Sequence, residues 1–255
     1  MRPQDIHACI VRIEGTNNED EMYRAFKNVG ATPHLVHLNE LKTLDPYQCI
    51  MIPGGFSAGD YVRAGAIFAS RIRSRLFDEL LDFVDHGYPV GGICNGFQVL
   101  VELGLLPGDG EPGEVTACLA ENDSARFECR HSLLLRTPSN PCAFTSRLPE
   151  GERLMVPSAH AEGKLLLAGG IRAYKRIEER GQVLFKYVNY ANETEAPYPW
   201  NPNGSPHNIA GICNEKGNVF GMMPHPERAF DIENENGYAG RTLFESLIRY
   251  IGETF

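Results

Sequence analysis

Short apolar runs alternate with helical segments along roughly the first hundred residues, and this alternation constrains the fold more than any other feature. Strands are expected at Ala8–Ile13, His34–Leu38, Cys49–Ile52 and Pro89–Ile93. Helices are expected over about 19–29, 72–85 and 97–103, with Gly104 as the C-cap of the third. Such βαβ units build a parallel sheet whose right-handed crossovers place helices on both faces.

The second half of the chain has a different pattern, with shorter strand-like runs, many of them expected to be antiparallel. These runs are Glu128–Arg136, Arg153–Val156, Lys164–Leu167, Val183–Val188, Ile209–Cys213 and Val219–Gly221, and an amphipathic helix follows over Tyr238–Ile251. No linker divides the chain. We therefore predict a single α/β domain over 1–255, with an open, mostly parallel, flavodoxin-like sheet and short antiparallel strands in the second half. Two long loops, 104–117 and 189–208, are expected to be functional or mobile.

Composition excludes several classes of function. The net charge of −9 is spread along the chain, which argues against a nucleic-acid surface and against binding to an anionic membrane. No run approaches the roughly 18 apolar residues of a membrane helix. The seven cysteines form no C-x-x-C pair, and the first residues show no signal-peptide pattern. We expect a cytoplasmic protein with free thiols and no metal site.

The strongest local signal is Gly92-Ile93-Cys94-Asn95-Gly96, where a strand ends and a helix begins. This G-x-C-x-G pattern is the cysteine counterpart of the nucleophile elbow. The two glycines keep side chains away from a tight turn that presents the thiol at the carboxyl edge of the sheet, where ligands bind in open α/β folds. The start of the helix favours a thiolate. The alternative is a structural cysteine beside a turn, as expected for Cys9, Cys49 and Cys213 in their apolar strands.

A thiol nucleophile needs a base, and the base needs an orienting group. Pro224 and Pro226 bias the segment around His225 toward an extended conformation. Because residues i and i+2 of an extended segment point the same way, His225 and Glu227 are expected to lie side by side. The carboxylate would then fix the imidazole tautomer, as in serine and cysteine triads. His34 and His37 lie three apart in a strand and face opposite sides, so we expect no metal site there.

The glycine-rich segment 53–60 follows a predicted buried strand. Glycine lets backbone amides approach a ligand closely, which suits an oxyanion hole. A phosphate-binding loop would need G-x-x-x-x-G-K-[ST], which is absent, and no G-x-G-x-x-G dinucleotide motif occurs either. An ordinary glycine turn remains the alternative.

These segments resemble the class I, or triad, glutamine amidotransferases, and among them the glutaminase subunits of phosphoribosylformylglycinamidine synthase. The matching segments are distributed through almost the whole chain: GTNNEDE (15–21), PGGFSAGDYVRAGA (53–66), GGICNGFQVLVELGLLPG (91–108), PSAHAEG (157–163), YPWNPNGSPHNIAGI (198–212) and GMMPHPER (221–228). One departure is Asn18, where many members of the family have a cysteine.

The resemblance implies a role for each matching residue. Cys94 would attack the side-chain amide of L-glutamine, His225 would transfer protons, and Glu227 would orient His225. The oxyanion hole would consist of the amides of Gly55 and Asn95. The remaining implied residues are Gln98, Gly54 and Phe56 as substrate contacts, and His160, Asn201 and Asn203 as partner-facing residues or as the lining of the ammonia path.

The resemblance also implies the setting of the reaction. The chain would hydrolyse L-glutamine to glutamate and ammonia through a Cys94 thioester, and the ammonia would travel to a large synthetase subunit in purine biosynthesis. ATP and magnesium would bind that partner, leaving this chain without a cofactor, and a small accessory subunit would join the assembly. Two alternatives are an independent γ-glutamyl hydrolase and a catalytically silent scaffold. The segments 157–163 and 201–205 argue against the first, and the presence of Cys94 and His225 argues against the second.

Overall fold

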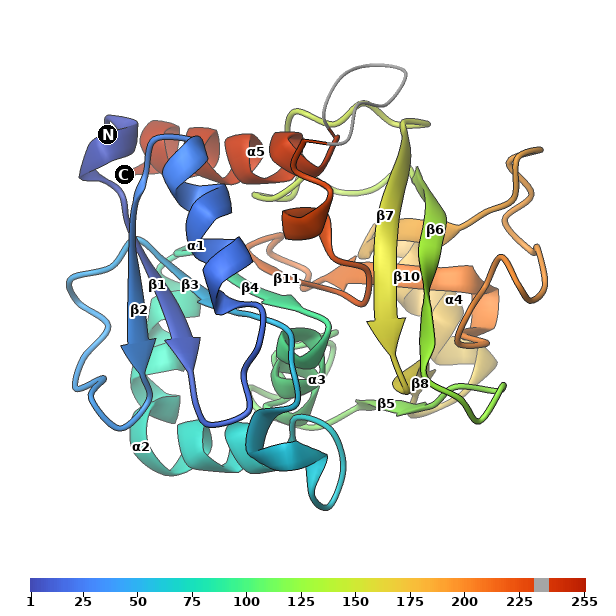
Figure 1. Ribbon diagram of the computed structural model, residues 1–255, viewed down its shortest axis with the longest axis horizontal. Coiled ribbons are helices and arrows are strands. Elements are labelled where there is room, and N and C mark those ends of the chain that lie inside the picture. Colours follow the sequence, from blue (N-terminus) through green and yellow to red (C-terminus); the bar gives the residue numbers. More distant parts are fainter. Residues whose placement is uncertain (232–238) are drawn as a thin grey trace.

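The computed structural model describes residues 1–231 and 239–255, and its central feature is a mixed sheet (Figure 1). The described strands of this sheet run in the order β2-β1-β3-β4-β11-β10-β9-β6-β7. The first five pair in parallel and the remaining pairs are antiparallel. Their bounds are β1 His7–Arg12, β2 Thr32–His37, β3 Cys49–Ile52, β4 Val90–Ile93, β6 Glu128–Arg136, β7 Arg153–His160, β9 Val183–Tyr187, β10 Ile209–Cys213 and β11 Val219–Met222.

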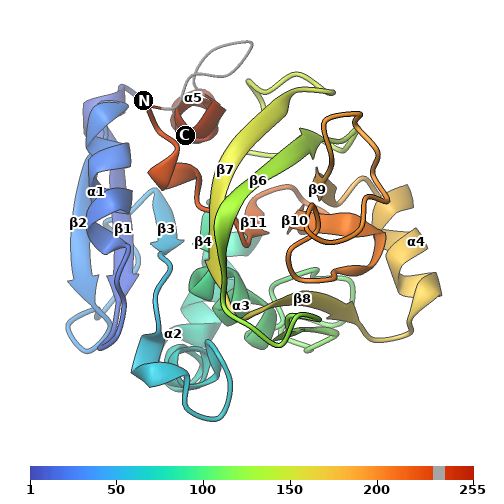
Figure 2. The same cartoon turned by 45° about the vertical axis from the view of Figure 1, so that its right-hand side comes forward.

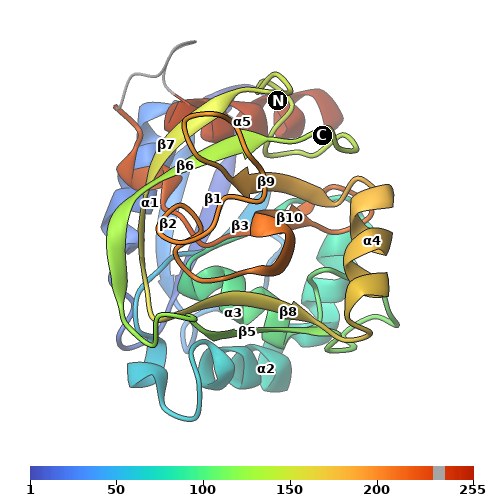
Figure 3. The ribbon, with the colours of Figure 1, turned by 90° about the vertical axis from the view of Figure 1, so that its right-hand side faces the viewer.

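Helices cover both faces of the parallel half, as the alternation predicted. In Figure 3, α5 lies above the sheet while α2 and α3 lie below it, and α1 packs beside α5. The helices are α1 Glu19–Asn28, α2 Ala66–Asp85, α3 Asn95–Glu102, α4 Ile171–Glu179 and α5 Ala239–Thr254, with short 3-10 turns at η1 Pro3–Asp5, η2 Ser57–Asp60, η3 Pro206–Asn208 and η4 Pro226–Arg228.

Two elements were missed by sequence reasoning, and several are longer than predicted, among them α2, which begins at Ala66 rather than at residue 72. A second, two-stranded sheet pairs β5 Ala117–Glu121 with β8 Glu162–Leu167 (Figure 3; β8 is also labelled in Figure 2), and β5 begins at the end of a segment that we expected to be a loop. Helix α4 is short and buries only three side chains, so the sequence contains few apolar positions from which the helix could be predicted. Strand β7 continues four residues beyond the predicted end at 156, because its partner β6 pairs with it as far as His160. The predicted start of the last helix, Tyr238, lies outside the described residues.

Close backbone approach fixes how α3 sits on the sheet. A Cβ atom at Gly96 would overlap the carbonyl oxygen of Ile52 in β3, and one at Gly92 would overlap the carbonyl of Gly96 itself. Only glycine allows this packing distance at both positions. The start of α3 is therefore pressed against the ends of β3 and β4, and the residue between these contacts, Cys94, has little freedom.

The helical layer above the sheet depends on an aromatic contact. Phe26 of α1 is fully buried and packs edge to face against Phe244 of α5, with ring centroids 5.4 Å apart. We predict that Phe26→Ala lowers the free energy of unfolding by about 4 kcal/mol, because it leaves a cavity between the two helices. Chemical denaturation measures this loss, and Lys27→Ala, an exposed neighbour in the same helix, is the control. A loss below about 1 kcal/mol would contradict the proposed packing.

Candidate active site

Three parallel strands end at the same edge of the sheet, and each leads directly into a predicted site residue. Gly54 follows β3, Cys94 follows β4 and His225 follows β11. The antiparallel half reaches this edge through β7: the amide of His225 donates to the carbonyl of Pro157 at 2.8 Å, and the Cys94 thiol lies 3.6 Å from the carbonyl oxygen of Ala159. The site therefore lies where the two halves of the sheet meet.

Cys94 has the strained backbone that a nucleophile elbow requires. Its φ of 54° and ψ of −108° are rarely adopted by a residue with a side chain. The residue caps the N-terminus of α3, and its amide donates to the carbonyl of Met222 in β11 at 2.8 Å. The contacts of Gly92 and Gly96 described above hold this conformation in place.

His225 and Glu227 form the pair that the sequence predicted. Nδ1 of His225 lies 2.6 Å from Oε1 of Glu227, and both side chains are buried. Burial disfavours a charged imidazole, but the charges of Glu227 and then Cys94 outweigh it and raise the pKa of His225 above its ordinary value. Nε2 of His225 has no hydrogen-bond partner within the described residues. The arrangement favours an imidazolium beside the Cys94 thiol, with Nε2 free to act on a substrate.

Gly54 borders the gap between the thiol and the imidazole. A Cβ atom on Gly54 would lie 2.7 Å from Cε1 of His225 and 3.3 Å from Cβ of Cys94. Gly55 has a φ of 136°, a backbone conformation that glycine adopts far more readily than other residues. It forms an isolated antiparallel β-bridge with Thr16. Among the described residues, none accepts a hydrogen bond from the backbone amide of Gly55 or of Asn95. Both amides are therefore available as oxyanion donors.

The other two predicted glutamine contacts differ in their exposure. Gln98 is buried. Its Oε1 accepts a hydrogen bond from the side-chain Nδ2 of Asn95 at 2.9 Å, and its Nε2 donates to the backbone carbonyl of Glu162. Phe56 is 48% exposed and lies 6.1 Å from the ring of Phe127. Gln98 is thus held in the interior at the start of α3, and Phe56 lies on the surface.

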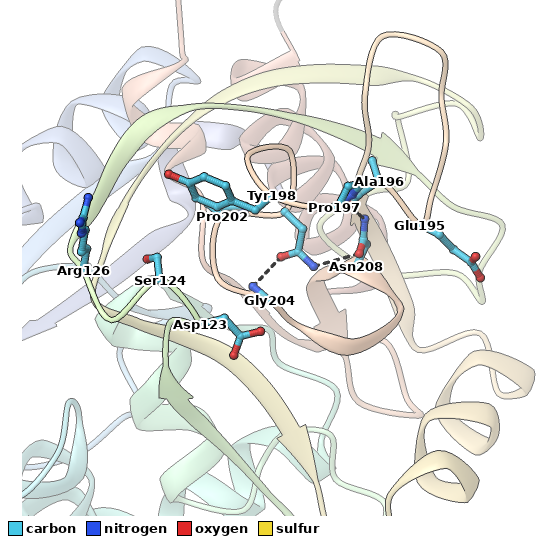
Figure 4. Close-up of a pocket in the computed structure, with 11 residues that line it drawn as sticks. Asp123, Ser124, Arg126, Glu195, Ala196, Pro197, Tyr198, Pro202, Gly204 and Asn208 are labelled. Carbon is cyan, nitrogen blue, oxygen red and sulfur yellow. Dashed lines mark hydrogen bonds between the residues drawn. The ribbon is translucent and has the colours of Figure 1, made fainter.

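The three residues predicted to face a partner or line the ammonia path are all buried in this chain. His160 and Asn203 lie side by side, because a Cβ atom on Gly163 would contact both of them. Asn201 lines a different space, a cavity of about 550 Å³ beside the 195–208 loop (Figure 4). These side chains do not form the surface of the isolated chain, and their part in an ammonia path stays a prediction.

Sequence reasoning missed several polar groups around the site. Asn18, noted only as a departure from the family pattern, is buried beside Gly54, and its side-chain oxygen accepts from the Arg228 guanidinium at 3.0 and 3.2 Å. Asp60 lies 3.4 Å from Asn95 and near Glu162. Arg228 lies only three residues after His225 and could have been considered with it. Asn18, just before α1, and Glu162, the first residue of β8, come from distant parts of the chain.

Comparison with known proteins decides the family. A model of the CobB/CobQ-like glutamine amidotransferase domain matches residues 5–250. The chain belongs to this glutamine amidotransferase family. It is 45% identical to the phosphoribosylformylglycinamidine synthase subunit PurQ of Archaeoglobus fulgidus, over 98% of this chain and 99% of that protein. The PurQ of Picrophilus torridus is also 45% identical, over 88% of this chain and 87% of its own length.

Solved structures agree with this assignment. A chain in the structure of PurLQS from Thermotoga maritima superposes with a TM-score of 0.75 at 34% identity, covering 96% of this chain and 99% of that one. A second glutamine amidotransferase from Thermotoga maritima, at 18% identity and a TM-score of 0.52 over 88% of this chain and 76% of its own, shares the fold alone. This amidotransferase is thus a PurQ-type, class I member of its family, and within 1–231 and 239–255 it has no helix able to span a membrane.

Asp60 gives the amidotransferase a stability that depends on pH. Burial, reinforced by the charge of Glu162, raises the pKa of Asp60 from an ordinary 3.8 to about 6. The folded state then binds more protons than the unfolded state within this window, so stability falls as the pH rises from about 4 to 6. Asp60→Asn removes the buried charge. We predict a gain in Tm of about 2 °C at pH 8, a small value because Asp60 is partly exposed.

The gain should vanish below pH 4, where Asp60 is protonated in both states. Differential scanning calorimetry at pH 4 and pH 8 measures both values. Asp45→Asn, a change at an exposed carboxylate, is the control. An equal gain at the two pH values would show that burial of the charge is not the cause.

Proposed function

We propose that this chain is the glutaminase subunit of phosphoribosylformylglycinamidine synthase, which releases ammonia from L-glutamine and delivers it to a synthetase subunit in purine biosynthesis. The observation that carries the proposal is the strained Cys94 beside the buried His225–Glu227 pair, in a chain that aligns with PurQ proteins over nearly its full length. The site contains the three groups that acyl transfer through a thioester requires: a nucleophile, a base and a carboxylate that orients the base.

The reaction follows from the charges in the site. The Cys94 thiolate attacks the side-chain amide carbon of glutamine, and the developing oxyanion accepts hydrogen bonds from the amides of Gly55 and Asn95. The His225 imidazolium gives its proton to the leaving nitrogen, so ammonia departs and a γ-glutamyl thioester remains on Cys94. His225, now neutral and held by Glu227, takes a proton from water. The hydroxide hydrolyses the thioester and releases glutamate.

Substrate recognition is assigned to the residues around the gap. Gln98 and the backbone of Gly54 and Phe56 would hold glutamine beside Cys94. The Gln98 side chain is fixed at both ends, by Asn95 and by the carbonyl of Glu162, so its position is set before substrate binds. Such preorganisation lowers the cost of aligning the amide with the thiol.

The wider assembly is part of the proposal. The relatives are subunits of a synthase by name, and the Thermotoga maritima structure is one of PurLQS. We infer a large synthetase partner that binds ATP and magnesium, together with a small accessory subunit, and no cofactor in this chain. A cytoplasmic location and the absence of nucleic-acid or membrane partners fit the dispersed negative charge.

Two measurements separate this function from an independent γ-glutamyl hydrolase. We predict that the partner synthetase and its nucleotide strongly stimulate glutamate release from glutamine, whereas an independent hydrolase would be equally active alone. We also predict that Cys94→Ser lowers glutamine-dependent turnover at least about a thousandfold, because hydroxyl replaces the thiolate nucleophile. Synthesis supported by added ammonium chloride should survive this change, since that step lies on the partner.

The matched control is Cys129→Ser, which alters an exposed thiol and should leave glutamine-dependent turnover as in the wild type. If Cys94→Ser retained glutamine-dependent turnover, the nucleophile assignment would be wrong. If the wild-type chain released glutamate equally well with and without the synthetase, the coupling to purine synthesis would be wrong.

A further inference from the structure

A second group of buried cysteines lies at the edge of the sheet opposite to Cys94. Strand β10 ends at Cys213 and runs antiparallel to β11, which leads to His225, so Cys213 lies at the far edge. Cys142, in the connection between β6 and β7, is also buried, with 3% of its surface exposed. Sequence reasoning predicted a packing role for Cys213 and assigned no role to Cys142, because no local pattern links the two.

Two contacts of the connection between β6 and β7 bring Cys142 to the end of β10. The amide of Ala143 donates to a carbonyl in the turn between β10 and β11 at 2.9 Å. The ring of Phe144 stacks on Phe220, which pairs with Cys213 across the two strands, and the ring centroids are 4.8 Å apart. The thiols of Cys142 and Cys213 are close enough that each affects the ionisation of the other through a hydrogen bond.

Arg136, the last residue of β6, adds a guanidinium to this buried group. It is 5% exposed and pairs with one side of β9, while β10, which ends at Cys213, pairs with the other side. The guanidinium donates to the carbonyl of Thr137 and, at 3.2 Å, to Oγ1 of Thr145. Its Nε has no hydrogen-bond partner, and no carboxylate of the described residues forms an ion pair with it. The cation therefore lacks the usual counter-charge.

A thiolate can supply this counter-charge. A guanidinium stays protonated at physiological pH, and burying it without an anion is strongly unfavourable. Burial by itself raises the pKa of Cys142, but hydrogen bonds with Cys213 and with the backbone of Phe144, together with the charge of Arg136, outweigh it and lower the pKa below its ordinary value. The pKa of Cys213 is raised, first by its hydrogen bond with Cys142 and then by burial. The pair thus consists of a thiolate at Cys142 beside a neutral thiol.

Two other buried cysteines show what the guanidinium adds. Cys9 and Cys49 are fully buried in β1 and β3, and among the described residues no arginine acts on either thiol. Burial raises the pKa of Cys9 to about 12 and also raises the pKa of Cys49. Because the thiolate is the nucleophilic form of cysteine, these two thiols are inert, whereas Cys142 is in its reactive form.

The cover over Cys142 is thin. Pro141, directly before it, is exposed, and residues 137–148 form turns instead of a helix or strand. Local opening of such a connection costs less free energy than global unfolding. A reagent little larger than water, such as hydrogen peroxide, can therefore reach the sulfur while the sheet stays folded.

We propose that Cys142 and Cys213 form a redox-active pair that a peroxide converts into a disulfide. The Cys142 thiolate attacks one oxygen of hydrogen peroxide, the O–O bond breaks, hydroxide leaves, and a sulfenic acid remains on Cys142. The sulfur of Cys213 then attacks the sulfur of Cys142, and the S–S bond forms as the hydroxyl departs with the Cys213 proton as water. The sulfurs are oxidised and the peroxide is reduced, and an added thiol reverses the change by exchange. This site lies outside the glutaminase machinery and uses none of its residues.

The test is peptide mapping of the full-length chain after brief treatment with hydrogen peroxide at neutral pH. Once catalase has removed the peroxide, free thiols are blocked in denaturant and the protein is digested with trypsin. We expect peptide 137–147, which contains Cys142, to be linked to peptide 187–216, which contains Cys213, with a mass lower than their sum by two hydrogen atoms. Dithiothreitol should separate the two peptides. The peptides that contain Cys9 and Cys49 are internal controls and should be recovered with blocked, unoxidised thiols.

Three variants, each checked for folding by circular dichroism, locate the chemistry. In Cys213→Ser, which lacks the second thiol, peroxide should leave a sulfenic acid on Cys142 that dimedone labels. Thr145→Val, which removes the hydroxyl beside the guanidinium and Cys142, should slow disulfide formation several-fold. Cys129→Ser, a change at an exposed thiol, is the matched control and should form the disulfide at the wild-type rate.

Two results would overturn the inference. One is a wild-type chain in which peroxide oxidises the exposed Cys129 but leaves Cys142 and Cys213 unlinked. The other is oxidation of Cys9 to the same extent as Cys142, because general opening of the protein, and not the buried guanidinium, would then control the reaction.

Discussion

The active site depends on one packing contact, the approach of α3 to the ends of β3 and β4. Gly92 and Gly96 have no side chains, so the first turn of the helix can press against the carbonyl of Ile52. This contact compresses the connection between β4 and α3 into a single residue, Cys94, whose backbone strain is balanced by packing on both sides. The backbone conformation of Cys94, rather than its side-chain rotamer, sets the direction of the thiol. The other groups of the site are arranged around the thiol.

Those groups come from both halves of the sheet, which explains the mixed topology. The parallel half supplies Cys94, Gly54 and His225 at its carboxyl edge. The antiparallel half supplies the β7 carbonyls of Pro157 and Ala159, which contact the His225 amide and the Cys94 thiol. Strand β11 joins the two halves, because it pairs in parallel with β4 and antiparallel with β10.

The sequence predicted the parallel half and the contact between His225 and Glu227 well, because their signals are local. Strand β3 was placed at its observed bounds, and the H-P-E spacing correctly placed His225 beside Glu227. It did not predict β5, α4 or the full length of β7, whose stability comes from pairing with distant partners. The surroundings of Asn18 and His160 were equally hidden, since loops from elsewhere in the chain bring Arg228 to one and Asn122 to the other. Local patterns report chemistry within a few residues, whereas a buried polar layer depends on the whole fold.

The chain ends lie together, away from this chemistry. The terminal amine of Met1 donates to the carbonyl of Gly252 in α5 at 2.7 Å, and Figure 1 shows both ends at the side of the sheet opposite to the arrowheads of β1 and β2. Gly54, Cys94 and His225 follow β3, β4 and β11, which run parallel to β1 and so end at the edge of the sheet opposite to the chain ends. A solid support, a fluorophore or a fused domain attached at either end would therefore leave the mouth of the site free for glutamine. Ends this close would also tolerate a short covalent connection, so new ends could be opened in an exposed loop without dismantling the nucleophile elbow.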